Sequence, residues 1–267
     1  MDDNERYDII KKEIDTLQIQ LAQVKKAWYT QPSVLISLTA LLFSFGTTIV
    51  AYINSYNEAV MANHREAMTI IQRLTKLPSE NFDLLQKYKD SGAGQSLSGM
   101  INQENILLAT QAANLVNKHP ESFTSTEFFA IATALSNSNI TEKVPYLFNT
   151  AIEKSTSGND YNVSTRAYAI YLYSKGEYKN GDLYFKKAMN VWEKFPEKNK
   201  YIINSTDIIT LVYWSQAELM AENINQAEVL IAQARARLLK LPPGLNTQML
   251  KNQINEASSY IQQIKGK

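Results

Sequence analysis

The feature that most constrains this chain is a run of 20 residues without a charged side chain, from Val34 to Ile53. Wound as an α-helix, such a run spans about 30 Å, the thickness of the hydrocarbon core of a bilayer. Its serine and threonine hydroxyls can bond carbonyls in the preceding turn of the same helix, so they do not exclude it from lipid. Aromatic side chains of the kind found at membrane interfaces flank the run, at Trp28, Tyr29 and Tyr52. We therefore predict one transmembrane helix over residues 33–53.

Two other interpretations of this run are weaker. A buried core helix rarely runs this long without a charge. A cleaved signal peptide usually has an apolar region of about 7–15 residues close to its start, whereas here 33 residues precede the run. An uncleaved anchor fits the pattern better.

The distribution of basic residues predicts the orientation of this anchor. Lysines and arginines near a membrane helix favour its cytoplasmic side. Five precede the run, at Arg6, Lys11, Lys12, Lys25 and Lys26, and the first two that follow are Arg65 and Arg73. This bias places the N-terminus in the cytoplasm and residues 54–267 outside it, with the helix in the plasma (inner) membrane.

The segment before the membrane, residues 1–32, carries a heptad pattern. Apolar residues alternate at spacings of three and four, at Tyr7, Ile10, Ile14, Leu17, Leu21, Val24 and Trp28. So narrow a seam is typical of a coiled coil, and we expect Ile10, Ile14, Leu17, Leu21 and Val24 to make a homo-oligomer contact. A helix on the lipid surface and a helix packed against another protein remain alternatives.

Small residues recur at four-residue intervals inside the run, at Ala40, Ser44 and Thr48. Such a stripe lets membrane helices approach closely. Together with the heptads it favours a homo-oligomer.

After the membrane run the pattern is helical almost throughout. We expect a stalk and a flexible loop over 54–99, with a break at Leu77-Pro78 and the loop in the Gly/Ser-rich stretch 91–99. Residues 100–267 form the main domain, so the chain is predicted to be all-α. Its expected helices are 101–118, 124–137, 141–155, 162–175, 178–195, 205–221, 224–240 and 247–264.

One helical pair in this domain carries a recognisable pattern. Residues 162–195 place small and large apolar groups at set spacing, at Tyr168, Ala169, Leu172, Gly181, Phe185 and Ala188, with Tyr178 after Gly176-Glu177. This resembles a tetratricopeptide repeat, whose two antiparallel helices pack closely at the small residues while residues such as Tyr178 and Phe185 fill the space around them. Thr165 stands where that pattern has its first Trp, and Pro196 falls about three residues late.

The neighbouring units match the repeat approximately, and the resemblance covers about 125–241. In the last unit Glu218 occupies a position that is normally large and apolar, and a longer connection is expected around 196–207. Residues 247–264 would close the array, with Met249, Ile254, Ala257 and Ile261 facing inward. An irregular helical bundle is the alternative architecture.

Composition argues against several functions. A net charge of +1 gives no general attraction for nucleic acid, and the absence of Cys excludes thiol chemistry and zinc–thiolate sites. The two His are isolated, and no catalytic or metal-binding motif is present. We therefore expect no catalytic residue, no metal and no cofactor, and predict that the protein is not an enzyme.

Binding is the function that remains. The resemblance implies a concave surface lined by the first helix of each pair, and this surface would contact a protein or peptide partner through Phe129, Thr133, Asn137, Arg166, Ile170, Tyr173 and Gln216. The sequence therefore predicts a single-pass membrane protein that serves as a scaffold or adaptor. The alternative is a membrane-acting effector, in which the helical domain senses a partner and clustered transmembrane helices perturb the bilayer.

Overall fold

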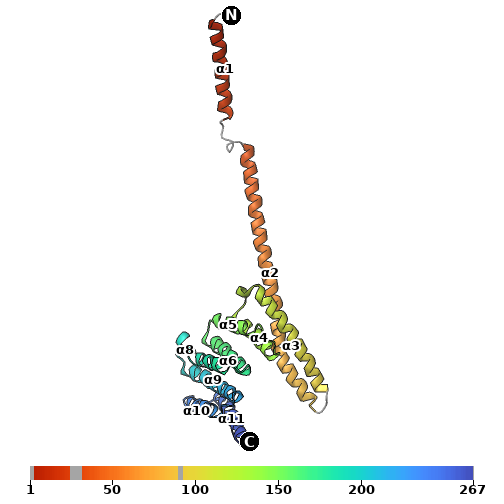
Figure 1. Ribbon diagram of the computed structural model, residues 1–267, viewed down its shortest axis with the longest axis vertical. Helices are drawn as coiled ribbons and strands as arrows, with labels where there is room; N and C mark the ends of the chain where they lie inside the picture. Colours follow the sequence, from red (N-terminus) through yellow and green to blue (C-terminus); the bar gives the residue numbers. More distant parts are fainter. Residues whose placement is uncertain (1–2, 25–31, 90–92, 267) are drawn as a thin grey trace. The chain divides into compact units, whose positions relative to one another are not determined.

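The computed structural model describes residues 3–24, 32–89 and 93–266, and within them all regular structure is helical. This confirms the all-α prediction for the described residues (Figure 1). After α1 (Asp3–Val24), α2 (Pro32–Lys87) and α3 (Ala93–Lys118), a 3₁₀ turn at Pro120–Ser122 leads to α4 (Ser125–Asn137), α5 (Val144–Glu153), α6 (Gly158–Ser174), α7 (Tyr178–Met189), α8 (Val191–Lys194), α9 (Lys200–Met220), α10 (Ile224–Leu238) and α11 (Leu245–Lys265). The chain divides into two compact units, Met1–Met61 and Ala62–Lys267.

In the first unit, α2 contains a stretch that is long and apolar enough to cross a bilayer. An 18-residue window of this helix has a mean hydropathy of 1.8, and none of that window is buried within the protein. The hydroxyls of Thr47 and Thr48 both donate to the carbonyl oxygen of Ser44, at 2.9 and 2.8 Å. The prediction that these hydroxyls are satisfied within their own helix is confirmed.

The α1 helix exposes its apolar seam. Ile10, Ile14, Leu17 and Leu21 each keep about half or more of their surface accessible. The side chain of Val24 and the residues Trp28 and Tyr29 lie outside the described part of the structure. The helix itself is confirmed, and its association with other helices stays a prediction.

The second unit starts at Ala62, earlier than the expected start of the main domain at residue 100. The later part of α2 buries one face, formed by Ala67, Ile70, Ile71, Leu74 and Leu77, in the same core as Ala109, Ala112, Ala113 and Val116 of α3. Residues 62–87 are therefore part of the helical domain, not a separate stalk.

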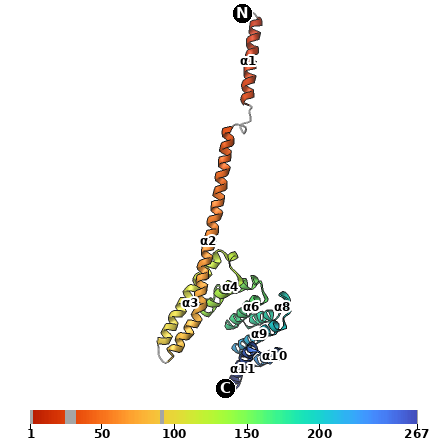
Figure 2. The same ribbon diagram turned by 180° about the vertical axis from the view of Figure 1, so that it is seen from behind.

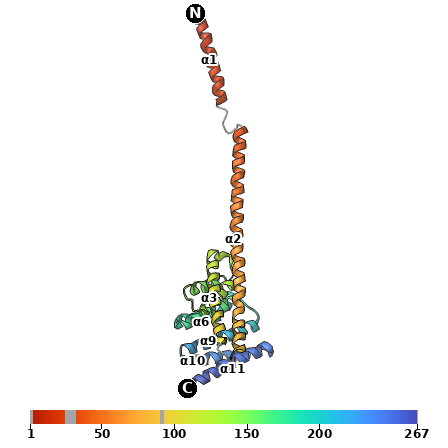
Figure 3. The ribbon, with the colours of Figure 1, turned by 90° about the vertical axis from the view of Figure 1, so that its right-hand side faces the viewer.

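The expected helix break at Leu77-Pro78 is wrong, because α2 continues to Lys87 (Figure 3). A proline inside a helix removes one backbone hydrogen bond. Here Leu74, whose carbonyl would have accepted that bond, and Leu77, which precedes the proline, are only 4% and 2% exposed. The hydroxyl of Ser79 donates to the carbonyl of Lys76 at 2.9 Å. Core packing therefore holds the helix together across the proline.

The expected loop over 91–99 is wrong for residues 93–99, which form the first turns of α3. Residues 91 and 92 lie outside the described residues. Gly94 allows the chain to pack tightly here, because a Cβ at this position would lie 3.0 Å from the carbonyl oxygen of Tyr88.

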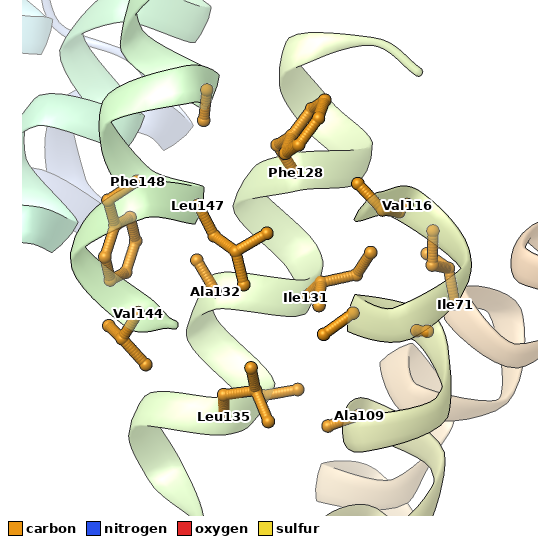
Figure 4. Packing of buried hydrophobic residues seen from close by; sticks show 14 of the residues in the cluster. Ile71, Ala109, Val116, Phe128, Ile131, Ala132, Leu135, Val144, Leu147 and Phe148 are labelled. Carbon is orange, nitrogen blue, oxygen red and sulfur yellow. The ribbon is translucent and has the colours of Figure 1, made fainter. Parts of the chain in front are cut away.

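From α4 onward, consecutive helices pair: α4 with α5, α6 with α7, and α9 with α10. The first helices of the pairs also contact each other, α4 with α6 and α6 with α9, and α11 packs on the last pair (Figures 1 and 2). Phe128, Ile131 and Leu135 of α4 fill the space between α3 and α5 (Figure 4). A second core, around Phe185, Leu211 and Ile254, joins α6, α7 and α9 to α11.

Several boundaries differ from the sequence prediction. The span 178–195 is divided at Asn190 into α7 and α8, and α9 begins at Lys200, so the connection expected over 196–207 is much shorter. In α11, Met249 is 56% exposed and its neighbour Leu250 is buried, which corrects the predicted inward face. Tyr178 is 43% exposed, so it does not fill the space beside Gly181 as expected.

Candidate partner-binding surface

The seven predicted partner contacts all lie on α4, α6 and α9, which pack in that order. Cross-helix pairs show how α6 and α9 align. The amide of Asn162 donates to the hydroxyl of Thr210 at 3.1 Å, and the hydroxyl of Tyr173 donates to Glu218 at 2.8 Å. The later residue of α6, Tyr173, contacts the later residue of α9, Glu218, so the two helices run parallel. One face of each is therefore presented along a common surface.

Arg166 is held in place on this surface by two neighbours. Its Nη1 donates to Oδ1 of Asn162 at 2.9 Å, and its guanidinium lies 5.0 Å from the centre of the Tyr213 ring. Asn162 is only 1% exposed and is itself anchored, since its amide donates to the carbonyl of Ala188 at 2.9 Å. The guanidinium is therefore preorganised by a buried amide and an aromatic face.

No carboxylate pairs with Arg166 in the described part of the chain, although Arg73 and Arg237 both have acidic partners there. Arg166 is half-buried, and this burial lowers the pKa of its guanidinium from the ordinary value. Taking a cation out of water without a counter-charge is unfavourable. The arrangement leaves several N–H donors of Arg166 available for an external acceptor.

Ile170 and Gln216 extend the surface beyond Arg166. Ile170 lies one turn further along α6 and is half-buried, and Gln216 follows Tyr213 on α9 and is exposed. Both positions are therefore accessible, next to an oriented cation. The sequence did not single out Tyr213, whose role depends on the alignment of two helices 40 or more residues apart.

Tyr173 does not belong to this surface, so its prediction as a partner contact is wrong. Its side chain is 3% exposed, and its hydroxyl donates to Oε1 of Glu218. Trp214 donates to the same oxygen at 3.1 Å, and Asn223 donates to Oε2 at 3.0 Å. Glu218 was a departure from the repeat pattern in the sequence, and the structure explains it as a buried carboxylate with three donors.

Phe129, Thr133 and Asn137 lie apart from Arg166, along a groove of about 410 Å³. The groove is bounded by α4 on one side and by α2 and α3 on the other, with Leu74, Asn81 and Ile101 among its lining residues. Sequence reasoning missed the contributions of α2 and α3, because both segments had been predicted to lie outside the repeat domain or at its end.

In the residues described, no group of three or more His, Asp or Glu side chains is placed to hold a metal ion. Comparison of this chain with protein-family models, curated proteins and solved structures finds no match.

Proposed function

We propose that this is a single-pass membrane protein whose helical domain binds partner proteins as a scaffold or adaptor. The observation that carries the proposal is Arg166, a preorganised guanidinium without a carboxylate partner among the described residues. A partner carboxylate supplies the missing counter-charge. The pairing of the helices and the buried positions of Ala169, Phe185 and Ala188 support a tetratricopeptide-like architecture for the domain.

The chemistry of the surface defines the partner. A guanidinium stacked on tyrosine favours a bidentate carboxylate, either an Asp or Glu side chain or a chain terminus. Ile170 adds an apolar contact and Gln216 an amide that can pair with a peptide group. With a net charge of +1, the protein gains little from a general electrostatic field, so recognition depends on these local contacts.

The N-terminal part of the chain provides the anchor in this proposal. The exposed apolar window of α2 lies in the plasma (inner) membrane, with the N-terminus in the cytoplasm and the helical domain outside it. Pairing of α1 helices makes the protein oligomeric. Several binding surfaces held at one membrane then act together, which raises avidity without any new contact.

Proximity labelling tests this proposal directly. A labelling enzyme fused to the C-terminus identifies partners of the wild-type chain and of Arg166→Gln, which removes the charge and keeps an amide. Arg235→Gln is the matched control, because Arg235 is a domain arginine that bonds Ser258 on α11 and lies on α10, away from this surface. We expect Arg166→Gln to lose partners that the control keeps. Identical partner sets for both variants and wild type would rule out this surface as the binding site.

A further inference from the structure

The α9 helix keeps an apolar stripe on its open face, beside Arg166. Tyr213 and Met220 are 41% and 50% exposed, and Ile209 is half-buried. Ile209 lies four residues before Tyr213 and Met220 seven residues after it, so all three share one side of the helix. The guanidinium of Arg166 lies over the Tyr213 ring, between the two ends of the stripe. The stripe therefore surrounds a cation that has no carboxylate partner among the described residues.

The outer face of α11 carries a similar stripe around an acid. Leu245, Met249 and Tyr260 are 80%, 56% and 55% exposed, and Glu256 is exposed as well. Tyr260 lies four residues after Glu256 and Met249 seven residues before it, on the same side of the helix. Another side of α11 packs into the core, through Leu250, Ile254, Ala257 and Ile261. No basic side chain pairs with Glu256 in the part of the chain that the structure describes.

We propose that a second copy of this chain lays its α11 antiparallel to α9 on this surface. The carboxylate of Glu256 from one copy pairs with Arg166 of the other, so each charge supplies the partner that the other lacks. Both stripes place an apolar residue about 6 Å from the charge in one direction and about 10 Å in the other, at the rise of an α-helix. In the antiparallel arrangement these intervals coincide. Met249 then lies against Met220, and the two remaining apolar residues meet on the other side of the ion pair.

A helix suits this surface better than an extended segment. An extended chain exposes backbone donors and acceptors at every residue, and beside the amide of Gln216 the stripe is mainly apolar. A helix satisfies its own backbone groups and presents only side chains. Copies held at one membrane meet at high effective concentration, and two such contacts can close a dimer. The inference rests on the proposed function, because it names a partner for the Arg166 surface.

Cysteine crosslinking of the full chain in membranes tests this contact, and the absence of native Cys makes the crosslink specific. Two differently tagged copies are expressed together, one with Met220→Cys and the other with Met249→Cys. We expect mild oxidation to give a disulfide-linked pair of the two copies. The control combines Met220→Cys with Met100→Cys, because Met100 is a 66% exposed methionine on α3, outside both stripes. The control should give several-fold less of the linked pair.

Charge reversal tests the ion pair itself. Glu256→Arg in both copies should lower the crosslink several-fold and leave the melting temperature unchanged, because Glu256 is exposed. Arg166→Glu should also lower it, and the two reversals together should restore it, because the charges are again opposite. Arg166→Gln is measured beside them, in case Glu at this position weakens the domain next to Asn162, and should lower the crosslink too. Glu142→Arg, at an exposed glutamate before α5, is the control and should keep the wild-type crosslink.

The outcomes separate this inference from the proposed function. Equal crosslinking of the test and control pairs, or an unchanged crosslink in Glu256→Arg, overturns the contact between copies. Loss of partners by Arg166→Gln in proximity labelling would then still support binding of other proteins. If Arg166→Gln keeps all those partners but loses the crosslink, the contact between copies is supported and the scaffold function at this surface is contradicted.

Discussion

Gly181 lies directly against the ring of Tyr173. A Cβ at residue 181 would come within 2.4 Å of Cδ2 of that ring and 3.1 Å of the carbonyl oxygen of Ala169. The ring cannot easily move aside, because the Tyr173 hydroxyl is bonded to Glu218 in the core. The spacing of α6 and α7 therefore requires glycine at position 181.

Gly181→Ala should destabilise the protein by about 1–3 kcal/mol, the usual cost of overpacking a core. The free energy of unfolding in urea measures this. Gly99→Ala is the control: Gly99 lies within α3, and a Cβ there meets nothing within 4 Å. That change should stabilise the helix by up to about 1 kcal/mol. Similar effects at both positions would argue against the close packing of α6 and α7.

Glu218→Leu should cost about 3 kcal/mol, because the donors of Tyr173, Trp214 and Asn223 would lose their acceptor in the core. Glu218→Gln retains one acceptor oxygen and should cost less than half as much. Urea unfolding followed by circular dichroism gives both values. A Glu218→Leu variant as stable as wild type would mean that the carboxylate is not satisfied by these donors.

The stability of the protein should fall in alkali. Burial raises the pKa of Tyr168, Tyr171, Tyr173 and Tyr184 above the ordinary value of about 10. Above pH 10 the unfolded chain therefore releases protons that the folded chain retains. The contribution of these tyrosines to the free energy of unfolding is fully present below that pH. It decreases as the pH rises towards and through their folded pKa values.

This alkaline effect can be followed by melting temperature between pH 8 and 11.5, with tyrosinate absorbance as a second signal. Tyr171→Phe removes one titrating group, whose hydroxyl makes a long hydrogen bond of 3.5 Å to the carbonyl of Thr141. The dependence on pH should be shallower in this variant. An equally steep decline would show that Tyr171 does not contribute.

Arg73 joins α2 to α3 through Glu104, with Nε–Oε1 and Nη2–Oε2 distances of 2.7 and 3.1 Å. Hydrogen bonds from Arg73 lower the pKa of Glu104. The contribution of this pair is thus present above the ordinary glutamate pKa of about 4.3 and is lost as the pH falls below it. Arg73→Gln should lower the melting temperature at pH 7.

The difference between Arg73→Gln and wild type should shrink towards pH 3, because protonation of Glu104 removes the charge that pairs with Arg73. Arg65→Gln, an exposed change on the same helix, serves as the control and should have little effect at either pH. A difference that is as large at pH 3 as at pH 7 would mean that Arg73 acts through packing rather than through this ion pair.

Charges placed in the apolar seam of α1 should reduce oligomer size. Ile14 and Leu17 are 49% and 59% exposed in the single chain, so Asp at both positions costs the monomer little but would bury charge in a helix–helix contact. Sedimentation in detergent measures the mass. The control is Gln18→Asp plus Gln20→Asp, since neither residue belongs to the apolar seam. A wild-type mass for the seam variant would exclude this contact.

Local patterns predicted the helices well where a helix buries one face. The expected span 224–240 corresponds to α10 at Ile224–Leu238, and Thr124 and Glu127 form the capping box that begins α4. The failures have physical causes. Pro78 ends isolated helices, but here buried leucines hold α2 together across it. The glycines and serines of 93–99 favour a loop in isolation, yet they form the start of α3.

The candidate surface was predicted only in part, because contacts between helices that are distant in the sequence decide which side chains are exposed. Helical spacing identified Arg166, Ile170 and Gln216, because positions one turn apart share a face. The same spacing placed Tyr173 beside them, although Glu218, on a helix 45 residues later, draws its hydroxyl into the core. Asn81 and Thr133 were not linked, since no local pattern brings residues of α2 and α4 to one groove.

The sequence by itself determined that this chain is helical, that one stretch of it is long and apolar enough to cross a bilayer, and that its α1 seam is apolar. These properties depend on periodicity and composition within single segments. The tertiary structure alone decided where the helical domain begins, which polar groups are buried with partners, and which are without one among the described residues. These properties depend on contacts between residues tens of positions apart, which local propensity does not encode.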